Sequence, residues 1–193
     1  MKFFRFPLLL ASLMNCAAVV QATPLVLDSA HTSAYFAASH FDRSLVRGRF
    51  KRITGQIDFD EAARSGTVDI RIDPDSIDTG LRALDDILKS SQFFDAEQFP
   101  EIRFQSTGFE FDGERLHAVN GKLSMHGVSL PVQLLADRFK CGEVKVMVLR
   151  RQVCGGAFHA TIKRSAFGMT RFLPDVGETV QIDISIEASP AGQ

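Results

Sequence analysis

Alternation of apolar and polar residues recurs along most of the chain, and this feature restricts its fold more than any other. In the clearest segment, residues 180–186, valine and isoleucine alternate with polar side chains. A period of two residues is typical of a strand that buries one face and exposes the other. Residues 68–73 and 158–163 repeat the pattern. The sequence therefore predicts an all-β domain.

The parity of this alternation changes at two places. The residues expected on the buried face have even numbers in residues 46–50 and odd numbers in residues 53–59. A similar change separates residues 102–106 from residues 109–111. A parity change within one strand predicts a β-bulge, which bends the strand. Because closed sheets need bent strands, we expect one closed antiparallel barrel. A two-sheet sandwich is the alternative.

Three leucines recur at helical spacing between residues 78 and 90, which predicts one short helix in that segment. Asp78 or Thr79 is the expected cap of its first turn. A helix of this length is too short to be stable alone, so we expect its leucine face to lie on the strand framework.

The N-terminal segment has the pattern of a secretory signal peptide, with basic residues, an apolar run and small residues near the end. Cleavage after Ala22 would separate a signal peptide, residues 1–22, from one mature domain, residues 23–193. A lipoprotein with Cys16 as the lipidated residue is the alternative, and Asn15 argues against it. Export through the inner membrane predicts a location in the periplasm.

Charge and cysteine content agree with this interpretation. The net charge is −1 for the whole chain and becomes more negative without the basic signal segment, which argues against nucleic acid as a partner and against general attraction to anionic membranes. Cys141 and Cys154 would remain after cleavage, and an even pair in an oxidising compartment predicts a disulfide. Free thiols or metal ligands are the alternative, although the spacing matches no zinc pattern.

Phenylalanine is abundant: the chain has 17, beside one tyrosine and no tryptophan. Phenylalanine supplies apolar area with no polar group to satisfy. A barrel of modest size is either filled by such side chains or holds one small ligand. Phe93-Phe94, followed by Phe99-Pro100, joins the predicted helix to the strand that begins near Ile102. This pair either contacts a ligand at a cavity entrance or anchors the helix to the barrel.

Two further groups of residues are candidate sites. His31 and His40 flank one predicted strand, but nine residues of strand span about 30 Å, which argues against one shared metal. Lys163 and Arg164 stand beside the apolar Phe167 and Met169 at a strand end. At a cavity mouth, the cations would meet a polar or anionic head group while the apolar pair contacts its tail. A surface cation pair followed by a turn is the alternative.

In their order and spacing, segments spread over nearly the whole mature chain resemble the YceI-like family of periplasmic, lipocalin-like, polyisoprenoid-binding proteins. The segments that carry this resemblance are Leu27-Asp28, His31-Thr32-Ser33, Phe36, His40, Gly48-Arg49-Phe50, Gly55, Phe59-Asp60, Ile77-Asp78-Thr79-Gly80, Leu88-Lys89-Ser90, Phe93-Phe94-Asp95, Phe99-Pro100, Phe104, Ser106, Gly121-Lys122-Leu123, Gly127-Val128, Pro131-Val132, Lys163-Arg164-Ser165 and Phe167-Gly168-Met169.

The resemblance implies a lipocalin-like antiparallel β-barrel of about eight strands with one short helix near its mouth. It also implies an elongated apolar cavity for an isoprenoid, such as a quinone or polyprenyl lipid, or for another long-chain amphiphile. It implies no catalytic residue, and we expect no metal or cofactor. Many relatives carry an Arg-Asp pair and a histidine in the helix, where this chain has Leu84-Asp85 and Ile87, so its head group could differ.

The expected function is therefore binding, transport or sequestration of such a lipid in the periplasm, without enzymatic activity. The expected partners are the lipid and a transient inner-membrane partner, and the expected state is a monomer or homodimer. The predicted lipid contacts are Phe36, His40, Phe93, Phe94, Phe104, Phe158, Ile162, Arg164, Phe167 and Met169. Two alternatives stay open: an envelope-stress module that binds proteins and has a filled barrel, and a lipid-modifying enzyme with His31 or His40 as acid or base.

Overall fold

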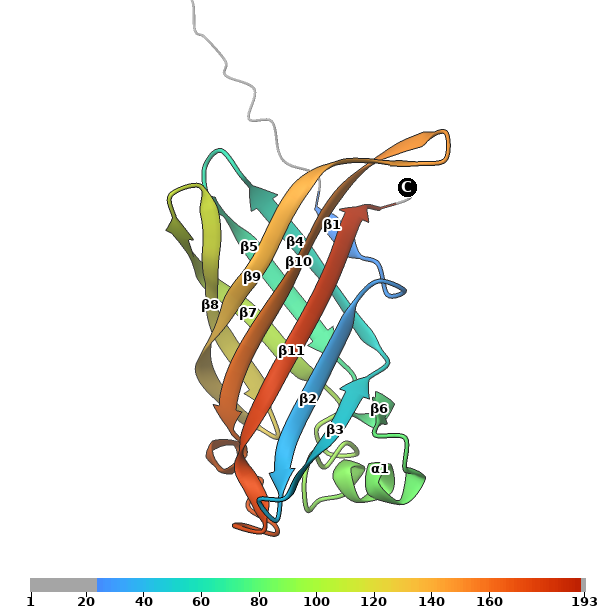
Figure 1. Ribbon diagram of the computed structural model, residues 1–193, viewed down its shortest axis with the longest axis vertical. Coiled ribbons are helices and arrows are strands. Elements are labelled where there is room, and N and C mark those ends of the chain that lie inside the picture. Colours follow the sequence, from blue (N-terminus) through green and yellow to red (C-terminus); the bar gives the residue numbers. More distant parts are fainter. Residues whose placement is uncertain (1–23, 192–193) are drawn as a thin grey trace, which may run out of the picture.

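The protein, described here for residues 24–191 by a computed structural model, is a closed antiparallel barrel (Figure 1). Hydrogen bonds join its strands in the order β1-β4-β5-β7-β8-β9-β10-β11-β2-β3-β6, and β1 also pairs with β11. This second pairing closes the sheet, so the barrel prediction is confirmed and the sandwich alternative is wrong. The predicted signal peptide lies outside the described residues.

The elements occur in the following order: β1 (Leu25–Leu27), β2 (Ser33–His40), β3 (Ser44–Phe50), β4 (Ile53–Asp60), β5 (Ser65–Ile72), the 3-10 helix η1 (Pro74–Ser76), β6 (Ile77–Asp78), α1 (Arg82–Lys89), β7 (Ile102–Asp112), β8 (Arg115–Met125), β9 (Val128–Val146), β10 (Leu149–Lys163), the 3-10 helix η2 (Arg164–Phe167) and β11 (Val176–Pro190). With β3 and β4 counted as one bent strand, the barrel has eight long strands, as expected.

The bend between β3 and β4 is a corner and not the bulge that the parity change predicted. β3 pairs with β2 and β6, whereas β4 pairs with β5 and β1, so the chain exchanges partners at Lys51 and Arg52. The buried hydroxyl of Ser76 accepts hydrogen bonds from both backbone N–H groups, at 3.1 and 3.0 Å. The same hydroxyl donates to the carbonyl of Asp73 at 2.6 Å. Ser76 therefore replaces ladder partners that the corner removes.

The second parity change is a true bulge. The register of β7 on β8 shifts between Ser106 and Gly108, where one strand gains a residue relative to the other. A bulge of this kind increases strand twist and helps the sheet to curve. The prediction for residues 102–111 is therefore confirmed.

Helix α1 begins four residues later than the start that the sequence predicted. Leu81 is its N-cap and makes no side-chain capping bond. Asp78 instead belongs to β6, and Thr79 donates both its backbone N–H and its hydroxyl to Asp85 Oδ1, at 2.8 and 2.7 Å. The carboxylate of Asp85 in the helix therefore holds the loop that precedes it. The expected arrangement is the opposite, with a side chain of the loop capping the helix.

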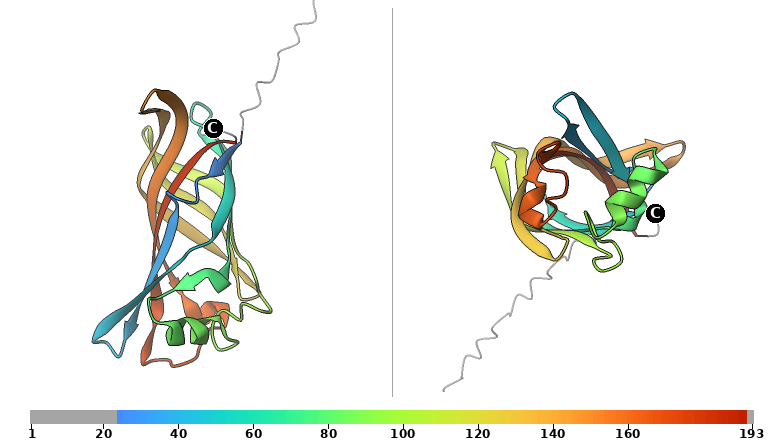
Figure 2. Two further views of the ribbon diagram at one scale, coloured as in Figure 1. Left: turned by 90° about the vertical axis from the view of Figure 1, so that its right-hand side faces the viewer. Right: turned by 90° about the horizontal axis from the view of Figure 1, so that it is seen from below.

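The two ends of the barrel differ. Helices α1 and η2 lie together at one end, which we call the helical end (Figure 1). Viewed from that end, the strands form a ring with α1 and η2 at its rim (Figure 2). The turns β4–β5 and β7–β8 and the β9–β10 hairpin lie at the opposite end, which we call the hairpin end.

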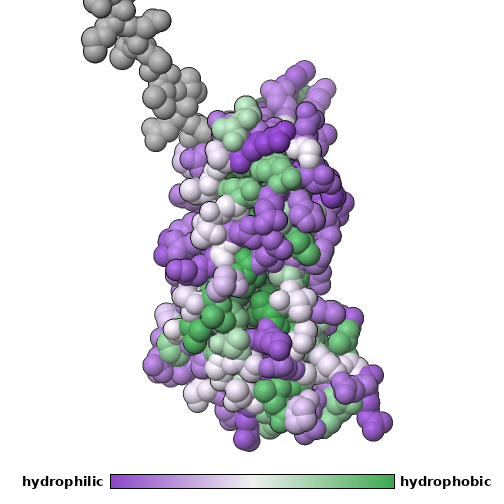
Figure 3. Space-filling model, turned by 90° about the vertical axis from the view of Figure 1, so that its left-hand side faces the viewer, coloured by the Kyte–Doolittle hydropathy of each residue, from purple (hydrophilic) through white to green (hydrophobic). Residues whose placement is uncertain are grey.

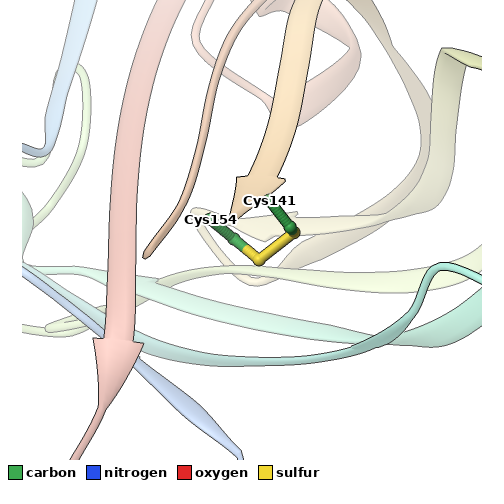
Figure 4. The surroundings of a disulfide bond; sticks show 2 residues. All are labelled: Cys141 and Cys154. Atoms are coloured by element: carbon green, nitrogen blue, oxygen red, sulfur yellow. A yellow bond between two sulfur atoms is a disulfide. The ribbon is translucent and has the colours of Figure 1, made fainter. Parts of the chain in front are cut away.

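The predicted disulfide between Cys141 and Cys154 is present (Figure 4). The two cysteines are direct cross-strand partners on β9 and β10, with Cα atoms 4.0 Å apart. Cys154 is buried and packs in the barrel core. The bond thus joins the two strands at the point where they leave the barrel.

Removal of the Ser76 hydroxyl tests the role of the corner. In Ser76→Ala, the N–H of Arg52 loses its buried acceptor, so we expect the free energy of unfolding to fall by about 1–3 kcal/mol. Urea unfolding followed by circular dichroism measures this change. The control is Ser129→Ala, whose exposed hydroxyl bonds to Ser124 and whose loss should change stability by less than about 0.5 kcal/mol. Equal stability of the two variants would contradict the assignment.

Candidate functional site

A cavity of about 730 Å³ occupies the interior of the barrel. Its wall is apolar except for Thr32, Tyr35, His40, Arg164 and Asp175. Pockets that enclose small molecules typically measure about 300–1,000 Å³ and have mostly apolar walls with a few polar groups. The barrel is therefore not filled, in contrast to the barrel that the protein-binding alternative assumed.

Strand β11 shows how the alternating sequence produces this cavity. Val180, Ile182 and Ile184 point to the lumen and line it, while the residues between them are exposed on the outer face. The three lumen side chains are only partly buried, whereas Ile186 further along the same face is buried in the core. The apolar surface that the strand leaves accessible here is therefore cavity wall, which favours an apolar occupant.

Two aromatic rings lie close to the barrel wall because the residues beneath them are glycines. Phe36 is the cross-strand partner of Gly48, and a methyl group at Gly48 would overlap the Phe36 ring. Phe104 lies over Gly121 on β8 in the same way. Side chains at these glycines would displace the rings, so the absence of a Cβ keeps the lumen open at both positions.

Phenylalanines also gather toward the hairpin end of the cavity. The ring of Phe59 on β4 lies 5.5 Å from Phe109 and 5.2 Å from Phe139, and Phe139 lies 6.3 Å from Phe158. These separations are within the range of favourable aromatic pairs. The deep end of the cavity therefore has an aromatic wall that comes from strands β4, β7, β9 and β10.

Phe93 and Phe94 lie at the helical end, between α1 and the barrel. Phe94 packs edge-on against Phe50 at 5.5 Å, and Phe93 packs in a small core with Leu88 of α1. Both also line the cavity. The rings that anchor the helix are thus also part of the cavity wall, and their contact with a ligand remains a prediction.

Apolar side chains surround the opening at this end. Phe41 from the β2–β3 turn, Leu81 and Ile87 from α1, and Phe172 from the loop after η2 all line the cavity, yet each remains substantially exposed. One face of the molecule also shows hydrophobic side chains gathered over the lower part of the barrel (Figure 3). Rim residues of this type give an apolar molecule a continuous path from the outside to the lumen.

Arg164 places a positive charge beside this opening. Its side chain is 4% exposed, and its guanidinium donates to the carbonyls of Gly177, Met169 and Val176 at 2.9, 2.7 and 2.7 Å. Burial lowers the pKa of Arg164, although a guanidinium remains protonated at neutral pH. Three carbonyl dipoles, with no carboxylate in salt-bridge contact within the described residues, stabilise the charge. The guanidinium also lies 5.7 Å from the centre of the Phe93 ring.

Nine of the ten residues predicted to contact lipid line the cavity. Phe167 is the exception: it is 1% exposed and packs against Ile102, Met125 and Met169, which line the cavity, but does not line it itself. The reason is the tight turn of η2, which directs Phe167 into the core while Arg164 and Met169 reach the cavity. Contact of the other nine with a lipid remains a prediction.

Sequence reasoning did not place the β11 wall or the rim in the site. The alternation at residues 180–186 identified the strand, but periodicity does not distinguish the lumen face from the outer face. Phe41 and Phe172 lie in turns, where no periodic signal exists. Leu81 is one of the three leucines whose helical spacing predicts contact with the barrel, but it is exposed at the start of α1 and lines the opening.

Neither His31 nor His40 both lines the cavity and forms a hydrogen bond with a carboxylate. His31 Nδ1 lies 2.8 Å from Asp28, and this hydrogen bond, with a smaller effect of Glu187, raises the pKa of His31. That pair is exposed and does not line the cavity. His40 lines the cavity and packs against Phe41, but it has no hydrogen bond to a carboxylate among the described residues. The geometry therefore gives no support to acid–base chemistry by either residue.

The described part of the chain contains no cluster of three or more His, Cys, Asp or Glu side chains suited to a metal ion. Among the same residues, no helix has the length and apolar character needed to span a bilayer.

Comparison with known proteins agrees with this geometry. A family model described as the YceI-like domain matches residues 25–188, which is most of the chain. The chain belongs to the YceI-like family. A UPF0312 protein of Shewanella denitrificans is 32% identical over 186 residues, covering 93% of this chain and 96% of that protein.

Two solved structures share the fold of this YceI-like protein. BcnA of Burkholderia cenocepacia superposes with a TM-score of 0.69 at 23% identity, covering 83% of this chain and 98% of BcnA. A polyisoprenoid-binding domain from Saccharophagus degradans, implicated in plant cell wall breakdown, gives a TM-score of 0.63 at 17% identity, covering 88% and 99% of the two chains. Both are therefore similar in architecture, including the closed barrel.

Exchange of Arg164 for lysine tests its structural role. In Arg164→Lys the charge is kept but the planar fork that reaches three carbonyls is lost, so we expect the free energy of unfolding to fall by about 1–3 kcal/mol. Thermal and urea unfolding measure the change. Arg171→Lys is the matched control, because Arg171 is exposed and its guanidinium only lies over Phe172 at 4.5 Å. If both variants were as stable as the parent, the carbonyl contacts of Arg164 would be energetically unimportant.

Proposed function

We propose that this YceI-like protein binds a long-chain isoprenoid, or a lipid of similar shape, inside the barrel and outside the inner membrane. The observation that carries the proposal is the cavity itself: about 730 Å³ of open space with an almost wholly apolar wall and an opening at the helical end. An elongated apolar chain matches this wall better than a polar substrate would.

The distribution of polar groups suggests one orientation for the lipid. Arg164, His40 and Asp175 line the cavity near the helical end, whereas the phenylalanines of β4, β7 and β9 line the deep end. The tail would therefore point toward the phenylalanines and the head group would stay near the opening. The positive charge of Arg164 favours a head group with oxygen atoms, such as a quinone carbonyl, a phenol or a phosphate.

The energetics are adequate for tight retention. Burial of each methylene contributes about 0.8 kcal/mol, so each five-carbon isoprene unit contributes about 4 kcal/mol before the loss of chain and protein freedom is subtracted. A few units inside the lumen are therefore sufficient for a stable complex in water.

Two observations support an isoprenoid ligand and a periplasmic location. The related fold of the Saccharophagus degradans domain carries a polyisoprenoid-binding description. The Cys141–Cys154 disulfide suits an oxidising compartment, as expected for a protein exported to the periplasm by the predicted signal peptide, residues 1–22. A carrier or scavenger in the periplasm would keep such a lipid from water between membranes.

A lumen-blocking substitution tests the proposal. Ile182 lines the lumen between its cross-strand neighbours Phe36 and Ala160, so Ile182→Trp should fill the cavity at that level. Purified parent protein, extracted with organic solvent and analysed by mass spectrometry, should contain a lipid or take up added polyprenol or quinone. Ile182→Trp should contain about tenfold less, as expected for a bulky residue that displaces several methylene contacts.

The matched control is Gln181→Trp, which places the same side chain on the outer face of the same strand. Circular dichroism should show that both variants fold. Failure of the parent to retain or take up any lipid would refute the proposed function. Equal lipid content in both tryptophan variants would show that the lumen is not the binding site.

A further inference from the structure

The β9–β10 hairpin extends beyond the barrel. Strand β10 joins β11 only from Cys154 onward, and β9 leaves β8 after Leu135, so residues 142–153 pair with each other and with no other described strand. Figure 1 shows this segment projecting from the hairpin end, opposite α1. We call residues 142–153 the β9–β10 ribbon.

The tip of the ribbon is apolar and exposed. Met147 is 87% exposed, Val148 is 89% exposed and Leu149 is 58% exposed. These three consecutive residues lie outside the described cavity wall, so a lipid in the lumen does not account for them. The exposed rim residues Phe41 and Leu81 are different, because they line the opening.

Cations flank this tip. Lys145, Arg150 and Arg151 are exposed in the ribbon, where Glu143 is the single acidic residue of the sequence between 142 and 153. Lys145 and Arg150 are direct cross-strand partners, an arrangement in which like charges repel. Arg150 also pairs with Glu143 at 3.1 Å, which offsets only part of this positive charge. The ribbon is thus locally basic in a chain whose net charge is −1.

The geometry points to an anionic lipid bilayer as the partner of this tip. We propose that Met147, Val148 and Leu149 enter the bilayer interface while Lys145, Arg150 and Arg151 contact lipid phosphates. Apolar side chains beside cations are the combination that binds anionic membrane surfaces. Lipid phosphates would also relieve the repulsion between Lys145 and Arg150.

A bilayer fits this surface better than a protein does. The apolar part is convex and consists of three side chains, whereas a stable protein interface buries about 800 Å² on each partner. A fluid interface needs no matching pocket. The disulfide at the base supports the arrangement, because a two-stranded hairpin alone is only marginally stable in water. The inference does not depend on lipid in the lumen, which opens at the other end.

Vesicle co-sedimentation of the mature protein tests the inference. Binding to phosphatidylcholine vesicles that contain phosphatidylglycerol should be about tenfold stronger than binding to phosphatidylcholine alone. It should weaken sharply at about 1 M salt, where the screening length falls to about 3 Å. The variant M147S/V148S/L149S should bind about tenfold more weakly, and K145Q/R150Q/R151Q should lose the preference for phosphatidylglycerol.

The control R47Q/R82Q/K122Q removes the same charge from exposed positions away from the hairpin end and should bind like the parent. The lumen variant Ile182→Trp should also bind vesicles normally, which separates this surface from the cavity. The inference is overturned if the parent ignores phosphatidylglycerol vesicles, if the control loses binding as much as the tip variants, or if Ile182→Trp abolishes it. Saturable binding of a protein to the tip, without vesicle binding, would overturn it as well.

Discussion

Closure of the sheet through β1 is the constraint on which the rest of the structure depends. This three-residue strand pairs with β4 on one side and β11 on the other, and so removes the edge that an open sheet would expose. At the helical end, β2 pairs with β11 and with β3. The chain then passes from β3 to β4 at the Lys51–Arg52 corner. Without the Ser76 hydroxyl, the N–H of Arg52 at that corner would lose its acceptor, whereas the N–H of Lys51 would keep the carbonyl of Ser76.

A barrel closed in this way encloses more space than its side chains fill. The hairpin end is narrowed by phenylalanines, and the helical end remains open between α1, η2 and the β2–β3 turn. Two charged residues line the cavity at this end, and Arg164 is the buried one, with its guanidinium held in place by three carbonyls, whereas Asp175 is exposed. The two ends of the lumen therefore differ: the hairpin end has an aromatic, apolar wall, and the helical end has charged residues.

Much of this architecture could be read from the sequence because strands, turns and one short helix have local signals. Alternation located β11, and the parity change at Ser106 located a real bulge. The identical signal near Phe50 had another cause, because the corner depends on Ser76, a residue about 25 positions away. Local patterns contain no information about such distant acceptors.

The site was harder to predict for a related reason. Parity shows which side chains share a face, but only closure decides that Ile182 faces the lumen. Phe167 and Arg164 belong to one short segment, and the turn of η2 sends them to different environments. Rim residues such as Phe172 come from irregular loops, where position follows from packing between elements and not from periodicity.

Gly48 and Gly121 have a consequence for how ligand preference could change among related barrels. Each glycine lets a phenylalanine ring rest on the wall, so its replacement by alanine would push that ring inward. Lumen width would then decrease while the wall stayed equally apolar. Selectivity between slender, saturated chains and broad, methyl-branched ones could in this way be adjusted by single methyl groups that never touch the ligand.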